Sequence, residues 1–192
     1  MPFVTVGEIV DVLIMTIAVG YVFMDVFRAR QQIPAEIPSG FSLGFDWKKL
    51  WFSCMVAAPA VLVHELGHKL VAIAFGLQAT FHAAYTWLGL GILLKLLNTG
   101  FIFFIPGYVA IQGFAGYLQH ALISFAGPGV NLLLWLAGYA VLKLKKHVSK
   151  TEYAFWAETK HINIFLFFFN MLPIPGIDGF GVYASLWQWF VT

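Results

Sequence analysis

The chain has 192 residues, of which 60% are hydrophobic, 18% aromatic and only 10% charged, with a mean hydropathy of +0.83. Soluble domains carry about 25% charged residues, so this composition excludes an ordinary soluble domain and indicates an integral membrane protein. The net charge of +2 gives no basis for nucleic-acid binding. The single cysteine, Cys54, excludes an internal disulfide and a zinc site built from several thiolates.

The first half of the chain contains two clear membrane-length segments. Residues 8–27 are apolar for about one crossing, and the polar, proline-containing stretch 28–49 is expected to be a loop. Residues 50–75 form the second expected span. The apolar stretch 77–97 is open to three interpretations: a span, a re-entrant segment or an interfacial helix.

A β-hairpin is predicted at residues 101–112. Two stretches rich in aromatic and β-branched residues flank the dipeptide Pro106-Gly107, which is typical of a turn between strands. Because an open sheet edge is not tolerated facing lipid, this hairpin must be covered by helices or line a wet cavity.

The second half of the chain alternates apolar stretches with breaks. Residues 117–142 form a clear span, and 143–160 are expected to be a lysine-rich loop. A further span at 161–172 ends at the turn 173–179, and a short aromatic segment closes the chain at 180–191.

The sequence His64-Glu65-Leu66-Gly67-His68 lies toward the C-terminal end of the second expected span. On a helix, His64 and His68 are one turn apart, so both imidazoles can bind one metal ion. Glu65 can hydrogen-bond a water at that metal and take its proton. These are parts of a zinc hydrolase site, which needs a third protein ligand.

Asp178 is the best candidate for the third ligand. A carboxylate at membrane depth costs several kcal/mol unless it is paired or bound to a cation. Asp178 follows a Pro-x-Pro-Gly turn that breaks a helix and can aim the side chain into a cavity, although a polar loop cap at the membrane surface is the alternative. Glu152 and Glu158 compete for the same role, but both follow a lysine cluster, where a solvated charge is more common.

Other polar side chains in the apolar segments are weaker candidates. Asn131 and Asn170 could hydrogen-bond a substrate carbonyl or oxyanion, and hydrogen bonding between helices is an equal alternative. For His82, His120 and His161 we expect structural or interfacial roles.

The chain resembles the site-2 protease family of intramembrane zinc metalloproteases. The resemblance rests on HELGH at 64–68, AGPGVN at 126–131 and NMLPIPGIDGF at 170–180, in the order of the family. It implies His64, His68 and Asp178 as zinc ligands, Glu65 as general base, and a membrane-embedded sheet after the metal-binding helix. The chain departs from the family pattern at Phe180, where a second glycine is common, and it has no PDZ-like insertion between the last two blocks.

We therefore predict an all-α polytopic membrane protein of about six transmembrane helices, with a small membrane-embedded β-hairpin or sheet near the active site. It is expected to be one domain over 1–192, with a core at about 50–180 and a peripheral first helix at 8–27. The cell membrane is its expected location, with several crossings. Lysine-rich loops and the family resemblance imply opposite orientations, and both stay open.

The predicted function is intramembrane zinc endopeptidase activity, with one Zn²⁺ per chain. The resemblance implies substrates that are single-span, membrane-tethered proteins cut within or next to their transmembrane segments. Two alternatives stay open. One is a membrane zinc protease of another class that uses Glu152 or Glu158 as third ligand. The other is a non-catalytic metal-bound protein that binds transmembrane helices.

Overall fold

The computed structural model describes residues 3–25, 46–99, 105–113 and 115–192. In this part of the chain there are six helices and one two-stranded antiparallel sheet, which confirms a mostly helical fold with a small sheet. The helices are α1 (Val6–Phe23), α3 (Trp47–Ala74), α4 (Tyr85–Leu96), α5 (Tyr117–Leu144), α6 (Lys150–Asn170) and α7 (Asp178–Val191), and the strands are β1 (Gln78–Ala83) and β2 (Gly107–Gln112).

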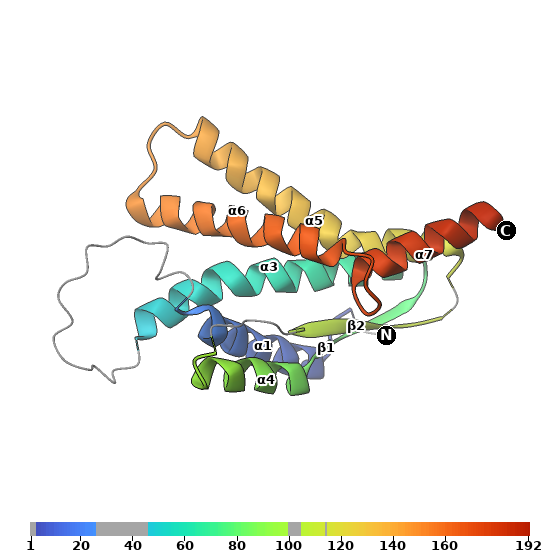
Figure 1. Cartoon of the computed structure of the whole chain (residues 1–192), viewed down its shortest axis with the longest axis horizontal. Coiled ribbons are helices and arrows are strands. Elements are labelled where there is room, and N and C mark those ends of the chain that lie inside the picture. The colour runs from blue at the N-terminus through green and yellow to red at the C-terminus, as the bar shows by residue number, and fades with distance from the viewer. Residues whose placement is uncertain (1–2, 26–45, 100–104, 114) are drawn as a thin grey trace.

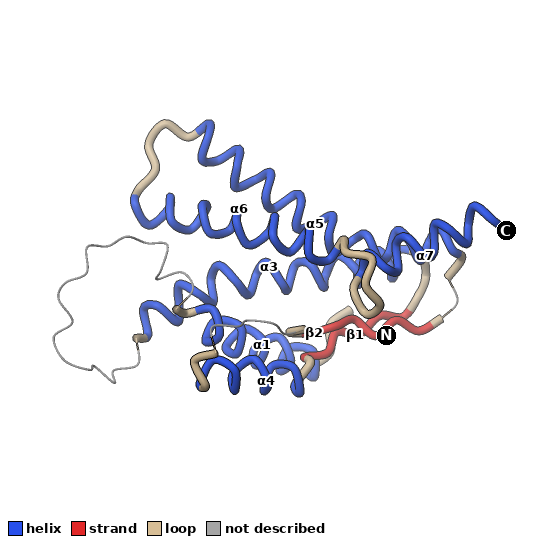
Figure 2. The backbone as a smooth tube through the Cα atoms, in the orientation of Figure 1, coloured by secondary structure: helices blue, strands red, loops and turns tan. Residues whose placement is uncertain are grey.

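Helix α3 lies at the centre of the molecule (Figure 1). It packs against α1 on one side and against α5 and α6 on the other, while α4 packs against α1. Helices α5 and α6 form an antiparallel pair, and α7 packs against α5 at the end of the molecule where the sheet lies (Figure 2). The helix that carries both histidines is therefore enclosed by neighbours.

Three of the described helices, α1, α3 and α5, are long and apolar enough to cross a membrane. They coincide with the spans predicted at 8–27, 50–75 and 117–142. Helices α4 and α7 have 12 and 14 residues. At 1.5 Å per residue they rise about 18 and 21 Å, which is short of a hydrocarbon core of about 30 Å. The sequence predicts about six transmembrane helices, but only three of the six described helices are clear candidates for crossing a membrane.

Helix α6 begins earlier than expected. The loop predicted over 143–160 is wrong in its second half, because the helix already starts at Lys150. The Ser149 hydroxyl accepts a hydrogen bond from the Glu152 N–H at 3.2 Å, so a Ser-x-x-Glu start signal outweighs the lysine content. Most of the loop expected at 28–49 lies outside the described residues, and residues 47–49 belong to α3.

The sheet pairs differently from the prediction. Strand β2 pairs antiparallel with β1, from Gln78 opposite Gln112 to Ala83 opposite Gly107. The hairpin predicted at 101–112 is therefore corrected: Pro106 precedes β2, and the partner strand lies on the other side of α4 in the sequence. The expected first strand of that hairpin, 101–104, lies outside the described residues. The ambiguous stretch 77–97 divides into β1 and α4.

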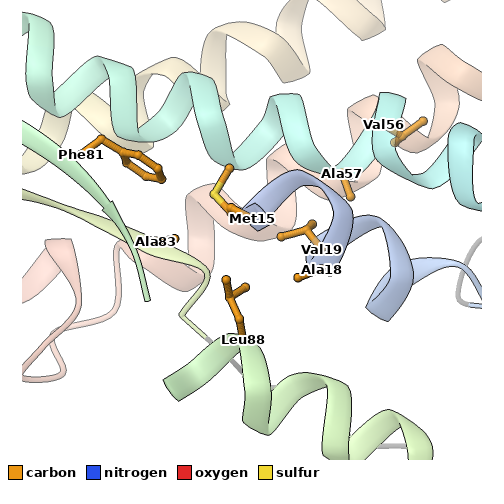
Figure 3. Packing of buried hydrophobic residues seen from close by; sticks show 8 residues of the cluster. All are labelled: Met15, Ala18, Val19, Val56, Ala57, Phe81, Ala83 and Leu88. Atoms are coloured by element: carbon orange, nitrogen blue, oxygen red, sulfur yellow. The ribbon is translucent and has the colours of Figure 1, made fainter. Parts of the chain in front are cut away.

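The apolar core lies between α1, α3, α4 and β1 (Figure 3). Met15 and Val19 of α1 are fully buried and face Ala57 of α3, and Phe81 of β1 and Leu88 of α4 complete the cluster. Small residues such as Ala57 let the two helices approach closely. Close packing of this kind drives helix association in lipid, where the surrounding solvent is as apolar as the side chains.

A buried ion pair fastens α1 to this core. The carboxylate of Glu8 accepts hydrogen bonds from the ammonium of Lys69 on α3 and from the backbone N–H of Phe81 on β1, the latter at 2.8 Å. It also accepts from the N–H of Thr5 at 2.8 Å, within a capping box at the start of α1. Both charged side chains are almost completely buried, so each depends on the other for compensation.

We predict that Lys69→Met destabilises the protein by about 3–5 kcal/mol, because it leaves the buried Glu8 carboxylate without a cation. Adding Glu8→Gln removes that charge, and the new amide oxygen still accepts from Phe81, but the amide nitrogen cannot replace the oxygen that accepts from Thr5. The double variant should therefore recover part of the loss in thermal unfolding of purified protein in detergent. Destabilisation that is simply additive would contradict this account of the pair.

Candidate metal centre

The two histidines of the HELGH sequence lie one turn apart on α3 and are both buried. Their rings are 4.8 Å apart between centroids and meet edge to face. The Nε2 atoms of His64 and His68 are 3.1 Å apart, so the two lone pairs converge on one point. This is the geometry that the one-turn spacing predicts.

The third group at this point is the carboxylate of Asp178. Its Oδ2 atom lies 3.0 Å from His64 Nε2 and 3.4 Å from His68 Nε2. Asp178 is the first residue of α7, directly after the turn that follows α6. Gly179 makes this placement possible, since a Cβ there would lie 2.5 Å from the backbone carbon of Met171. The turn thus folds tightly back and delivers the carboxylate to the histidines.

Each histidine is oriented by a hydrogen bond at its other ring nitrogen. The Nδ1 of His68 lies 2.7 Å from the backbone carbonyl of Ile123 on α5. A carbonyl can only accept, so Nδ1 carries the proton and Nε2 offers its lone pair. The Nδ1 of His64 lies 2.6 Å from Oδ1 of Asn131, also on α5. Metal-bound histidines are typically held in this way.

The space between the three groups fits a metal ion. Tetrahedral zinc with bonds of 2.0–2.1 Å separates its ligand atoms by about 3.3 Å, close to the 3.0, 3.1 and 3.4 Å found here. A Cβ on Gly127 of α5 would lie 2.3 Å from His68 Nε2 and 2.6 Å from His64 Nε2. Because residue 127 is glycine, α5 closes the site without filling it. The donor set of two imidazoles and one carboxylate is one that zinc accepts.

Glu65 lies beside the three groups and shares a cavity with them. The cavity has a volume of about 290 Å³ and is lined by His64, His68, Glu65 and Asp178 together with β2 and the first half of α5. The side chain of Glu65 is itself buried. A buried carboxylate, a candidate metal site and a cavity therefore meet in one place.

The two predicted asparagines occupy different positions. Asn170, the last residue of α6, lines the cavity. Asn131 is completely buried behind His64, and its amide nitrogen donates to the carbonyl of Ala60 at 3.0 Å and to Oδ1 of Asn163 at 2.8 Å. Its contact is thus with a candidate ligand rather than with the cavity, and a direct role toward the substrate stays a prediction.

The structure does not bring the competing glutamates to the metal centre. Glu152 forms an ion pair with Lys145 at 2.5 Å, and Glu158 is buried in α6 outside the walls of the cavity. Among the described residues, the cluster of His, Cys, Asp and Glu side chains that could hold an ion is His64, His68 and Asp178.

Of the remaining histidines, His120 does line the cavity, and its Nδ1 lies 2.9 Å from the hydroxyl of Ser185 on α7. His82 lies on β1 beside Tyr108, and His161 is exposed on α6.

Sequence reasoning missed Asn163 of α6. It is completely buried, its Oδ1 accepts from Asn131, and its amide nitrogen donates to the carbonyl of Thr159 at 2.8 Å. The only sequence signal is a polar residue in an otherwise apolar run, which marks a possible hydrogen bond between helices but not its partner.

Comparison with known proteins finds similarity to several zinc metalloproteases. The chain is 32% identical over 177 residues to "Putative zinc metalloprotease MJ0611" of Methanocaldococcus jannaschii, covering 90% of this chain and 81% of that protein. Proteins with the same description, sll0528 of Synechocystis and Rip2 of Mycolicibacterium smegmatis, are each 30% identical. These matches cover 76% and 64% of this chain, and 34% and 52% of the relatives. No family model and no solved structure matches the chain.

We predict that Gly127→Ala abolishes metal binding while the protein stays folded. The added methyl group would lie within 2.3 Å of His68 Nε2, in the space between the ligands. Alanine is the better helix former by about 1 kcal/mol, so the substitution does not weaken α5 itself. Zinc titration of the purified protein in detergent measures the effect.

Gly129→Ala is the matched control, because it lies one half-turn away in the same motif and its Cβ would meet only the Phe125 ring, at 3.2 Å. It should bind zinc as the unmodified chain does. Equal zinc affinity in the two alanine variants would show that residue 127 does not border the metal site.

Proposed function

This chain belongs to the site-2 protease family of zinc metalloproteases, and from that premise we propose that it is an intramembrane zinc endopeptidase. Its substrates would be membrane-tethered, single-span proteins, cut within or next to their transmembrane segments. The observation that carries the proposal is the position of the site. His64, Glu65 and His68 lie on α3, a helix that is long and apolar enough to cross a membrane, and they face a cavity.

We further propose that the protein crosses the cell membrane several times. Helices α1, α3 and α5 are the candidate spans. Helix α6 has 21 residues and is long enough, but its first half carries four charged residues, and it is not among the helices that are apolar enough to cross. A site enclosed by such helices is shielded from bulk water, which fits a protease whose substrates reach it through the bilayer.

The proposed cofactor is one Zn²⁺ per chain, held by His64, His68 and Asp178. When bound, zinc acts as a Lewis acid and lowers the pKa of water toward neutrality. Glu65 then serves as the general base that takes a proton from the attacking water and returns it to the leaving amine. Asn170, in the cavity wall, is proposed to donate a hydrogen bond to a substrate carbonyl.

A substrate must be extended to be cut, and strand β2 offers a place for an extended chain. Residues of an antiparallel strand alternately bond the neighbouring strand and turn their N–H and C=O away from it. The N–H of Ala84 donates to the carbonyl of Pro106, so these two residues are a hydrogen-bonded pair in the register of the sheet. Counting along β2 from this pair, the N–H and C=O groups of Gly107, Val109 and Ile111 point away from β1, toward the outer edge. All three residues line the cavity.

The opposite edge of the sheet is already occupied. Phe81 of β1 pairs with Val109, and by the same alternation its N–H points away from β2. There it donates to Glu8 of α1. Among the described residues, the edge open to a further strand is that of β2, beside Glu65. We propose that the substrate adds to this edge as a strand, so that main-chain hydrogen bonds hold it open next to the metal.

The catalytic role of Glu65 makes a direct prediction. Glu65→Gln should bind zinc with unchanged stoichiometry but lose cleavage, because the amide cannot accept a proton. The measurement is product mass after incubation with a panel of single-span substrates, with and without a chelator. Unchanged processing by this variant would rule out the proposed mechanism, and a chain that binds zinc and substrate without any cleavage would favour a non-catalytic protein.

Strand addition predicts an effect of removing one outward N–H. Ile111→Pro deletes a donor on the open edge of β2, where proline does not interrupt bonds to β1. It should raise KM for an unfolded peptide substrate more than it lowers kcat. Ile111→Ala keeps the N–H and controls for the lost side chain. The same test at Val109 should agree. Normal KM in a stably folded proline variant would contradict binding at this edge.

A further inference from the structure

Two buried asparagines connect His64 to the backbone of α6. Asn131 of α5 bonds His64 Nδ1 through its Oδ1 at 2.6 Å and bonds Asn163 of α6 through its Nδ2 at 2.8 Å. Asn163 in turn donates to the carbonyl of Thr159 at 2.8 Å. Both asparagine side chains are fully inaccessible to solvent. The chain of bonds therefore runs through the interior, from a candidate metal ligand to a helix that carries none of the ligands.

The donor and the acceptor of each hydrogen bond in this series follow from two backbone carbonyls that take part in it. Backbone carbonyls only accept, so the groups facing the carbonyls of Ala60 and Thr159 must be the two amide nitrogens. The Oδ1 atoms then face the other way, and Asn163 Oδ1 accepts from Asn131. Asn131 Oδ1 is left to accept from His64, whose Nδ1 must therefore carry the proton. Its Nε2, which points at Asp178, keeps a free lone pair.

We propose that Asn163 is a positioning residue of the metal centre, which fixes the tautomer of His64 through Asn131. Were the Asn131 amide reversed, its NH₂ group would face Nδ1 and favour the tautomer with the proton on Nε2, the atom needed for the metal. Asn163 opposes this reversal together with the carbonyl of Ala60, because both of these oxygens would then face the Asn131 oxygen. The proposal rests on the metal-dependent function proposed above and adds a residue that touches neither metal nor substrate.

His68 provides an internal comparison. Its tautomer is fixed by the carbonyl of Ile123, which is separate from the asparagine chain. A change at Asn163 should therefore alter the tautomer of His64 and leave that of His68 as it is. A general loosening of the fold would affect both rings.

The test uses the full chain in detergent or nanodiscs with ¹⁵N-labelled histidine. Asn163→Leu removes the acceptor and keeps the number and branching of the side-chain heavy atoms. We expect zinc affinity to fall by about tenfold or more, the range found when partners of metal-binding histidines are removed. In zinc-free protein, the ¹⁵N shifts of His64 should show a larger share of the tautomer protonated at Nε2 than in the unmodified chain, because only the Ala60 carbonyl then holds Asn131, whereas His68 stays protonated at Nδ1.

Two further variants keep the experiment decisive. Thr159→Val is the matched control: it removes a buried hydroxyl that has no partner among the described residues but keeps the carbonyl that Asn163 uses. It should leave zinc affinity and both tautomers unchanged. Asn163→Asp, in its neutral form, keeps an acceptor for Asn131 and donates its own proton to the Thr159 carbonyl, so it should restore most of the affinity lost in Asn163→Leu. It also tests the proposal if the leucine variant does not fold.

Unchanged zinc affinity and an unchanged His64 tautomer in folded Asn163→Leu would overturn the proposal, as would equal losses in Thr159→Val. Neither readout depends on peptide cleavage. A chain that binds zinc but cuts no substrate would therefore contradict the proposed function and still decide the role of Asn163. Failure of the unmodified chain to bind zinc would contradict the proposed function itself.

Discussion

The close contact between α3 and α5 is the constraint on which the site depends. Two histidines one turn apart on α3 converge on a metal position only if the facing helix leaves that position open, and Gly127 does so. The same helix supplies the Ile123 carbonyl and Asn131 that orient the two rings. Helix α7 packs against the first half of α5, and this contact brings Asp178 to the histidines. A shift of α5 would disturb the spacing, the tautomers and the third ligand together.

The sheet and α1 define the other side of the cavity. Glu8 covers the outer edge of β1 and pairs with Lys69, the residue that follows the second histidine. Since one edge of the sheet is occupied in this way, the edge left available among the described residues is that of β2, beside Glu65. The buried ion pair thus orients the sheet relative to α3. The cost of removing the Glu8 carboxylate from water is offset by the charge of Lys69 and by two backbone hydrogen bonds.

Local signals predicted the parts of this structure that local chemistry determines. Hydropathy over about twenty residues located α1, α3 and α5, because a crossing needs that length, and the spacing of His64 and His68 indicated a shared metal. Strand pairing between residues far apart in the sequence could not be predicted from local patterns. The partner of β2 precedes α4 in the sequence, and the local pattern at 101–112 predicted a hairpin instead. For the same reason the role of Asn163 could not be predicted from the sequence. Asp178 was the preferred third ligand, with the two glutamates as alternatives. The start of α6 is different, since the Ser149 cap was a local signal that the lysine content obscured.

We expect one metal ion to be held between α3 and the start of α7. The most direct measurement is the zinc content of purified variants, by mass spectrometry of the metal, for Asp178→Ala against Glu152→Ala and Glu158→Ala. Only the aspartate variant should lose zinc, while both glutamate variants retain one ion per chain. Full zinc occupancy in Asp178→Ala, with loss in either glutamate variant, would show that a glutamate and not Asp178 is the third ligand.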